Sequence, residues 1–271
     1  MRFAFGKNWS RFLSVINDER IAEAEASLQK MLLRSDLRGL RFLDIGSGSG
    51  LFSLAARRLG ASVHSFDYDQ MSVACTTELR RRYAPEDPDW RVEQGSVLDE
   101  PFMQSLGSFD IVYSWGVLHH TGALWEAMAR AADVVAPGGQ LYIAIYNRQQ
   151  LWSTYWTVVK RAYNKAPGLG KSLMHWGYYA FFVTALTVAD LARGRSPVER
   201  FRGRGRRGMS MYYDVSDWIG GWPFEVAAPE EVLNALRGSG FVLQGLKTCG
   251  GKHGCNEFLF QKTESPSSAS L

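Results

Sequence analysis

An aspartate and three glycines stand close together in a stretch whose residue types could bind a ligand. Asp44 ends a short apolar run, and Gly46, Gly48 and Gly50 follow it at alternate positions. Glycine tolerates a positive φ and lets a ligand approach the backbone without meeting a Cβ atom. The amphipathic residues 51–59 come next, and a helix beginning there would offer unpaired N–H groups and partial positive charge. The stretch predicts a cradle for a polar ligand, with a tight strand-to-helix turn that binds nothing as the alternative.

The spacing of these glycines limits the kind of ligand. A dinucleotide fingerprint has the spacing G-x-G-x-x-G, whereas here the third glycine comes one residue early and Leu51 stands in its place. The carboxylate of Asp44 would repel a pyrophosphate and attract a cationic amino acid. The spacing therefore favours a ligand with a cationic amino-acid group and disfavours a dinucleotide that carries hydride.

A second acidic residue stands at the end of the next expected strand. Residues 61–66 alternate in polarity and lead into Asp67, 21 positions after Gly46. In nucleotide-binding sheets, a carboxylate at this place accepts hydrogen bonds from ribose hydroxyls. Asp69 has a simpler explanation as a cap of the helix expected over residues 70–83, whereas Asp67 at the strand tip is less easily explained as a cap.

Two adjacent histidines, His119 and His120, follow a fourth expected strand over residues 109–114. Histidine titrates near neutral pH, so one of the pair is the natural general base for removing a proton from an acceptor. Ligands of open α/β sheets lie at the carboxyl ends of the strands, which is where the loop over residues 115–121 belongs. The structural alternative is that the pair caps or packs against the next helix.

The elements that would bring these residues together alternate between strand and helix. Strands are expected over residues 40–45, 61–66, 90–94, 109–114 and 140–146, and a helix over 229–236 precedes a hairpin formed by 241–247 and 257–261. Repeated β–α alternation with short links predicts an α/β fold with a parallel, doubly wound sheet.

At these motifs the chain resembles the class I S-adenosylmethionine-dependent methyltransferases, whose first motif is an acidic residue followed by G-x-G-x-G. The resemblance covers residues 40–147 and 228–262. Within that superfamily, residues 117–121 (Val-Leu-His-His-Thr) and 137–139 (Pro-Gly-Gly) are similar to the ubiquinone-biosynthesis-like and natural-product small-molecule methyltransferases. The resemblance implies a Rossmann-like, seven-stranded mixed sheet with an antiparallel last strand, and S-adenosylmethionine (SAM) as cofactor.

The resemblance and the motifs together assign residues to the cofactor site. These are Asp44, Gly46, Ser47, Gly48, Gly50, Asp67, Tyr68, Ser96, Val97, Ser114 and Trp115. Related enzymes often carry Gly-Asp where this chain has Gly-Ser, so adenine contacts are expected from Ser96 and the Val97 backbone, while a role for Asp99 stays open. The group covers O-, N- and C-methylation; the histidines favour oxygen, and Ser-Trp-Gly-Val at 114–117 argues against methylation of exocyclic base nitrogens.

Residues 148–227 are an insertion too long for a loop, and we expect them to cap the acceptor pocket. Residues 174–192 are nearly all apolar and about long enough to span a bilayer. A buried cap helix is the preferred interpretation, with membrane-surface contact or a lipophilic substrate channel as alternatives. The acceptor is expected to be small and largely apolar or aromatic. Its expected contacts are Tyr146, Tyr212, Tyr213, Asp214 and Trp218.

Seven arginines interleaved with glycine lie between positions 193 and 207. Such a run can contact nucleic acid, anionic lipid or an acidic substrate, or it can be a solvated loop. Peripheral membrane contact through residues 174–207 is therefore one hypothesis. Two other functions stay open: a nucleic-acid methyltransferase or binding protein that uses this loop, and a SAM-binding regulatory protein without catalysis.

Composition and the ends of the chain complete the expectations. The 271 residues are 46% hydrophobic with a net charge of +4, which allows a substantial core and gives only a mild basic bias. Three scattered cysteines and no apolar leader favour a reduced cytoplasmic protein, and no carboxylate cluster suggests a metal site. Residues 1–37 are expected to form a helical lid, or a helix packed on the sheet. Residues 38–147 and 228–262 are expected to form the SAM-binding domain, and 263–271 a disordered tail.

Overall fold

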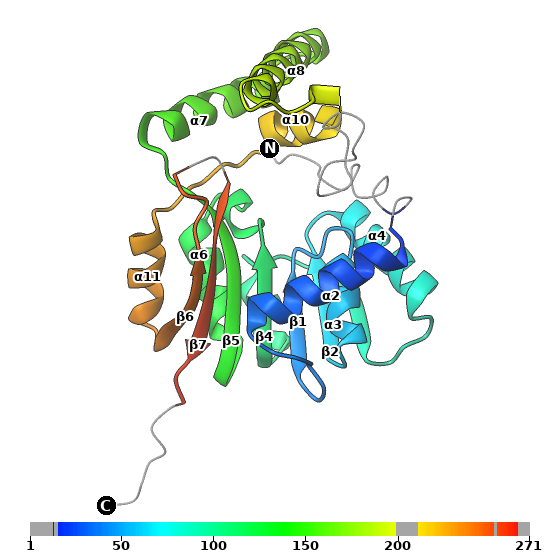
Figure 1. Ribbon diagram of the computed structural model, residues 1–271. Helices are drawn as coiled ribbons and strands as arrows, with labels where there is room; N and C mark the ends of the chain where they lie inside the picture. Colours follow the sequence, from blue (N-terminus) through cyan, green and yellow to red (C-terminus); the bar gives the residue numbers. More distant parts are fainter. Residues whose placement is uncertain (1–12, 14–15, 199–210, 252–253, 265–271) are drawn as a thin grey trace, which may run out of the picture.

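The computed structural model of the chain describes residue 13 and residues 16–198, 211–251 and 254–264, without the side chains of 211–214. Seven strands form one sheet in the order β3-β2-β1-β4-β5-β7-β6 (Figure 1). They are β1 (Arg41–Ile45), β2 (Ser62–Asp67), β3 (Trp90–Gln94), β4 (Phe109–Trp115), β5 (Val135–Tyr146), β6 (Phe241–Lys247) and β7 (Cys255–Lys262). Strands β1 to β5 are parallel, and β7 is antiparallel to both of its neighbours. The predicted α/β class and the seven-stranded mixed sheet are confirmed.

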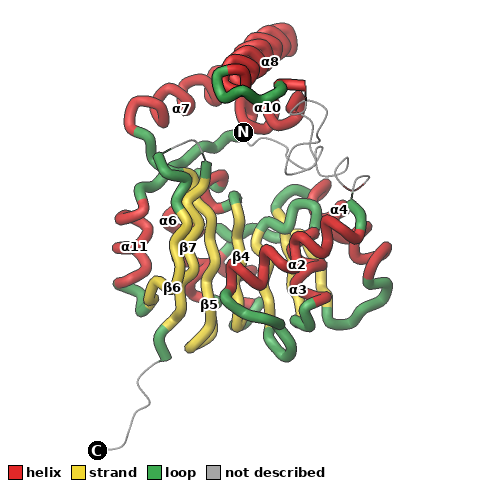
Figure 2. Tube along the Cα trace, viewed as in Figure 1, coloured by secondary structure: helices red, strands yellow, loops and turns green. Residues whose placement is uncertain are grey.

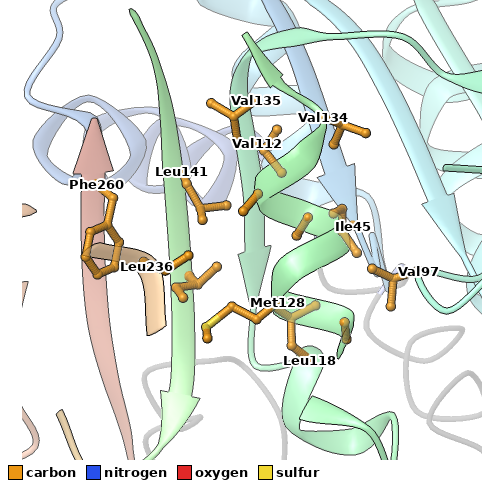
Figure 3. Close-up of a cluster of buried hydrophobic side chains, with 14 of the residues drawn as sticks. Ile45, Val97, Val112, Leu118, Met128, Val134, Val135, Leu141, Leu236 and Phe260 are labelled. Atoms are coloured by element: carbon orange, nitrogen blue, oxygen red, sulfur yellow. The ribbon is translucent and has the colours of Figure 1, made fainter. Parts of the chain in front are cut away.

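Helices cover both faces of this sheet (Figure 2). They are α2 (Asp18–Leu32), α3 (Leu51–Arg58), α4 (Gln70–Tyr83), α5 (Glu100–Ser105), the short 3-10 helix η2 (Leu118–His120), α6 (Leu124–Asp133) and α11 (Pro229–Arg237). Figure 3 shows the core on one face, where Met128 of α6 lies near Leu118 and the sheet contributes Val112 and Leu141. The core on the other face includes Phe42, whose side chain points opposite to that of Leu43 because successive strand residues alternate.

Two aspartates near the carboxyl ends of β2 and β3 act as helix caps. Asp69 Oδ1 accepts a hydrogen bond from the Met71 N–H (2.8 Å), which is the simpler explanation that the sequence offered for this residue. Asp99, whose role stayed open, accepts from the Phe102 N–H (3.1 Å) at the start of α5. The sequence did not predict α5, because six residues are too few to show helical periodicity.

The N-terminal helix α2 forms a layer of the fold. Its side chains Ile21, Ala24, Leu28 and Leu32 are buried against α3 and the sheet, which is the packed arrangement considered as an alternative to a lid. Residues 1–12 and 14–15, which complete the expected lid, lie outside the described residues, as does most of the expected tail, 265–271.

The insertion forms a helical layer at the carboxyl end of the parallel strands (Figure 1). It contains α7 (Gln150–Lys165), α8 (Gly168–Leu191) and α10 (Met211–Gly220), which contact one another around a third hydrophobic cluster that includes Trp156 and Ile219. Residues 199–210, which hold most of the arginine cluster, lie outside the described residues.

The expectation that residues 174–192 form a buried cap helix is wrong. Only His175 and Asp190 are buried in α8, whereas Trp176 is 55% exposed and Phe181 is 61% exposed. The reason is geometric: the 24-residue helix packs against α7 and α10, and those two helices leave its outer side uncovered. No helix among the described residues is long and apolar enough to cross a membrane.

Candidate functional site

The glycine loop is tightly packed at the carboxyl end of β1. The N–H groups of Gly46 and Ser47 both donate to the Phe66 carbonyl oxygen (2.9 and 3.1 Å), which fixes the loop to β2. Gly46 has a φ of +78°, and a Cβ atom there would lie 2.5 Å from the Val117 side chain. A Cβ atom on Gly50 would lie 2.9 Å from Thr76. Such contacts require glycine at both positions, and the predicted succession of strand, glycine loop and helix is present.

Asp67 is joined directly to this loop. Its Oδ2 atom accepts a hydrogen bond from the Gly48 N–H (3.0 Å), and Oδ1 accepts from the Asp69 N–H (2.9 Å). Burial raises the pKa of the Asp67 carboxyl to about 6, although the two N–H donors act in the opposite direction. The carboxylate predicted to accept ribose hydroxyls therefore lies beside the loop predicted to cradle the same ligand.

Asp44 points to the face of the sheet that α3 covers. The residue is buried, and its Oδ2 accepts a hydrogen bond from Ser53 Oγ (2.5 Å). Burial, together with the nearby charge of Asp67, raises the pKa of the Asp44 carboxyl to about 7, although the Ser53 hydrogen bond acts in the opposite direction. Within the described residues, Oδ1 of Asp44 makes no hydrogen bond. One oxygen of this carboxylate is thus available to a donor on a ligand.

The remaining predicted cofactor residues lie at or just after the ends of strands, with different degrees of exposure to solvent. Tyr68 is exposed, and Trp115 is half-buried. Val97 lies with its side chain in the hydrophobic core, so a ligand contact there would come from its backbone. Ser96 Oγ accepts from the Leu98 N–H (3.2 Å), and the buried Ser114 hydroxyl donates to the Ile45 carbonyl oxygen (3.1 Å).

The two histidines lie in the loop after β4, where His119 is buried and His120 is half-buried. His119 is fully buried with its ring 3.9 Å from that of Tyr146, and its Nε2 has no hydrogen-bond partner among the described residues. Nδ1 of His120 donates to the Pro223 carbonyl oxygen (2.6 Å), because a carbonyl can only accept.

The premise that these histidines titrate near neutral pH is wrong. Burial lowers the pKa of His120 to about 4, and it lowers the pKa of His119 well below its usual range. The charge of Lys160 contributes to the lowering of both pKa values. Both imidazoles are consequently neutral at pH 7. Burial opposes the charged form of a histidine, and sequence alone does not show how deeply a loop residue is buried.

Two of the expected acceptor contacts meet beside His119. Tyr146 and Trp218 have ring centroids 5.6 Å apart, and both line a small pocket between the sheet and the insertion. The rest of the lining consists of Asn147, Gln149, Ser153, Trp156, Phe224 and Gly254. The side chains of Tyr212, Tyr213 and Asp214, also expected here, lie outside the described residues.

Sequence reasoning missed Lys160, a fully buried cation on α7. Its Nζ donates to the Trp218 carbonyl oxygen and lies 4.3 Å from the centroid of the Trp218 ring and 4.7 Å from that of Phe224. Burial lowers the pKa of Lys160 to about 7. Its position four residues after Trp156, on the buried face of an amphipathic run, was the signal that could have identified it.

Glu225 is a second missed residue, and it ties the insertion to the histidine loop. Its carboxylate accepts from the N–H groups of Gly122 (3.0 Å) and Leu124 (3.1 Å) at the start of α6. Its own N–H donates to the His119 carbonyl oxygen (3.0 Å). No local motif marks such a contact, because about a hundred residues separate the partners.

Comparison with known proteins finds a matching family and similar sequences. A family model described as a methyltransferase domain matches residues 16–195. The ubiquinone biosynthesis O-methyltransferase of Rhizobium rhizogenes is 34% identical over 113 residues, which are 41% of this chain and 43% of that protein. The match therefore spans less than half the length of this relative.

Solved structures show the same fold at low sequence identity. An O-methyltransferase family protein from Burkholderia thailandensis has a TM-score of 0.55 and 13% identity, with 94% of this chain and 63% of that chain covered. Magnesium protoporphyrin IX methyltransferase from Synechocystis PCC 6803, solved with bound SAH, has a TM-score of 0.51 and 14% identity, with 90% and 83% covered.

Proposed function

Because the chain belongs to the methyltransferase-domain family and has the class I SAM-dependent methyltransferase fold, we propose that it methylates a hydroxyl oxygen of a small, largely apolar or aromatic molecule. One observation carries this proposal. Gly46 of the cofactor loop packs against Val117, and His119 and His120 follow in the same loop. A methyl donor held by the first loop would therefore lie next to candidate proton acceptors in the second.

The residues present fit SAM, which supplies an electrophilic methyl group when bound. The positive-φ loop admits a ligand close to the backbone, and Asp67 offers a carboxylate to the ribose hydroxyls. Asp44 has one oxygen available for the ammonium group of the amino-acid portion. A charge-assisted hydrogen bond of this kind contributes about 1.5–3 kcal/mol.

Of the two histidines, His120 is better arranged to remove the acceptor proton. Its Nδ1 proton is committed to the Pro223 carbonyl oxygen, so Nε2 of the neutral ring carries the lone pair. The low pKa keeps this ring in its proton-accepting form at pH 7. Fully buried His119 packs against both His120 and Tyr146, with ring centroids 4.5 and 3.9 Å away, and so supports both rings.

The aromatic rings around the pocket at the base of the insertion support the proposal of an apolar acceptor. Tyr146, Trp156, Trp218 and Phe224 line it, and the insertion that supplies three of them would cover the methyl-transfer position. Ligand pockets are mostly apolar with a few placed polar groups. Excluding water at this place protects the reacting groups during transfer.

Calorimetric titration with SAM and with NADH tests the cofactor part of the proposal. We expect SAM to bind with one site per chain and NADH to give no measurable heat, because of the glycine spacing and the acidic Asp44. Binding of NADH without binding of SAM would reverse the assignment.

We also propose that the outer face of α7 and α8 contacts an anionic membrane surface, from which an apolar acceptor would enter. Ten of the seventeen large apolar side chains exposed within the described residues lie on these two helices. On α8 they include Leu169, Leu173 and Trp176 at spacings of three or four residues, which gives one apolar stripe. A group of exposed apolar side chains as large as this one indicates an interaction site.

The charges around this stripe fit anionic lipid headgroups. Asp190 is the only acidic residue between positions 148 and 198, and it is buried. Exposed cations flank the stripe at Arg161, Lys165, Arg193 and Arg195. Each basic residue near an anionic surface contributes about 1 kcal/mol of attraction. This pattern is typical of a helix that lies in the membrane interface.

Flotation with vesicles tests the membrane proposal. We expect the protein to float with vesicles of anionic lipid, less so at high salt, and not with purely zwitterionic vesicles. The double variant Trp176→Ser/Phe181→Ser should partition about 10- to 100-fold less, since it removes two exposed aromatic side chains. The matched control is Val242→Ser/Leu246→Ser, which alters exposed apolar residues on β6 and should float like the wild type. Equal flotation of both double variants, or none for the wild type, would exclude this surface.

A further inference from the structure

Four buried side chains on four different elements form one hydrogen-bonded chain that ends on Asp44. Trp90 Nε1 of β3 donates to Ser65 Oγ of β2 (2.9 Å), and Ser65 Oγ donates to Ser53 Oγ of α3 (2.8 Å). Ser53 Oγ in turn donates to Oδ2 of Asp44 on β1 (2.5 Å). Each of the four residues is at most 3% exposed, so water does not compete along the chain.

The indole N–H of Trp90 sets the direction of donation along this series of hydrogen bonds. An indole N–H can only donate, whereas a serine hydroxyl has one proton to donate and also accepts. If Ser53 donated to Ser65 instead, Ser65 would accept from both Trp90 and Ser53, and its own proton would have no acceptor among the described residues. The Ser65 proton is therefore directed to Ser53, and the Ser53 proton to Asp44. A protonated Oδ2 on Asp44 would place two protons in one hydrogen bond. The hydrogen-bonded series therefore matches the ionised carboxylate and opposes protonation of Asp44 at Oδ2.

We propose that Trp90, Ser65 and Ser53 are positioning residues for the cofactor: through this chain they hold Asp44 as an oriented anion whose free Oδ1 accepts the ammonium group of the ligand. This inference rests on the proposed SAM site. It extends that site to Trp90, two strands away from Asp44 in the sheet. The network also connects its donors in series, so that each bond polarises the next.

The surroundings of Asp44 explain why such support is needed. Burial raises the pKa of Asp44 to about 7 even though the Ser53 hydrogen bond lowers it, so weakening that bond would leave most of this carboxyl protonated in the free protein at neutral pH. The titratable groups that face it are Asp67 at the end of β2, whose charge raises the pKa of Asp44, and Tyr113 on β4, its partner across the β1–β4 register. Among the groups around it, the Ser53 hydroxyl favours the charged form.

The test compares two ligands that share adenosine and differ in the amino-acid group. S-adenosylhomocysteine carries the ammonium, and 5′-methylthioadenosine does not. At pH 7, Ser65→Ala and Trp90→Phe should bind S-adenosylhomocysteine about five-fold more weakly than the wild type, which corresponds to a rise of about one unit in the pKa of Asp44. Both variants should bind 5′-methylthioadenosine with unchanged affinity. Ser65→Ala is the safer variant, since Trp90 also fills the core.

A pH series separates positioning from a general structural defect. Removing a hydrogen bond to the charged form raises the pKa, so the loss should shrink to within about two-fold at pH 8.5, where Asp44 is ionised in both proteins. Ser72 is a buried serine on α4 that does not belong to the hydrogen-bonded series, and Ser72→Ala should bind both ligands normally. Asp67→Ala should weaken both by about ten-fold or more, since both carry ribose hydroxyls.

The possible failures are distinct. Equal loss of both ligands in the Ser65 and Trp90 variants, or unchanged binding of S-adenosylhomocysteine at every pH, would overturn the role of the chain. If wild-type protein binds neither ligand, the proposed cofactor site itself fails, whatever the variants do.

Discussion

Replacing His120 with alanine is expected to lower kcat by about 10²–10⁴-fold while the Kd for SAM changes little, because the residue removes a proton and does not hold the cofactor. The Nδ1–H bond to the Pro223 carbonyl oxygen fixes the ring so that Nε2 accepts the proton. Single-turnover rates and calorimetry on the same variant separate chemistry from cofactor binding.

Two matched variants show whether the loss comes from the missing base. His120→Asn keeps an N–H donor near the Pro223 carbonyl oxygen and removes the proton acceptor, so it should lose as much activity as His120→Ala. His64→Ala, near the amino end of β2, should keep kcat within about two-fold. Full activity of His120→Asn would assign proton removal to another group.

The pH dependence of the wild type follows from the depressed pKa of His120. The proton-accepting ring is neutral, and this form is lost only as the pH falls through about 4. The histidine should therefore cause no change in kcat between about pH 5 and pH 8. A histidine-dependent step in kcat near pH 6.5 would mean that the ring is exposed to water in the working enzyme.

Replacing Gly46 with alanine should weaken SAM binding by at least about 100-fold. The added Cβ atom would lie 2.5 Å from both Cγ atoms of Val117, and the backbone φ of +78° is strained for any residue with a side chain. Relief of this clash must move the cofactor loop away from the histidine loop. Titration calorimetry with SAM measures the loss.

The clash and the backbone strain can be separated with two further variants. Gly39→Ala has almost the same φ, +76°, but no atom within 4 Å of the added Cβ, so it should cost some stability and leave SAM binding intact. Adding Val117→Ala to Gly46→Ala removes the Cγ atoms that collide and should recover part of the binding. If Gly46→Ala binds SAM normally, the packed loop is not the cofactor cradle.

Much of the fold could be predicted from local signals. Strands β1 to β4 each end at a glycine or an acidic turn, and the spacing at Gly46, Gly48 and Gly50 marked the strand-to-helix loop directly. The prediction failed where no local signal existed. Helix α5 has only six residues, and β5 begins at Val135 because Pro137 to Gly139 continue the strand instead of forming a separate turn.

The site itself depended more on contacts between distant residues. Asp67 and the histidine loop were predicted because their positions after strands have physical meaning in any open α/β sheet. Lys160, Glu225 and the chain from Trp90 to Asp44 were not, because their partners lie on other elements. The pKa values of the histidines and the exposure of α8 likewise depend on how elements cover one another, which composition does not reveal.

The measurement that tests the proposed function most directly follows the methyl group. Purified protein is incubated with SAM carrying a ¹³C-labelled methyl group, together with aqueous and lipid extracts, and the products are identified by mass spectrometry and NMR. We predict labelled product in the lipid fraction with its methyl carbon bonded to oxygen, S-adenosylhomocysteine formed in equal amount, and neither product with His120→Asn. SAM that binds but keeps its label with every extract, or label transferred to a nitrogen of nucleic acid, would contradict the proposal.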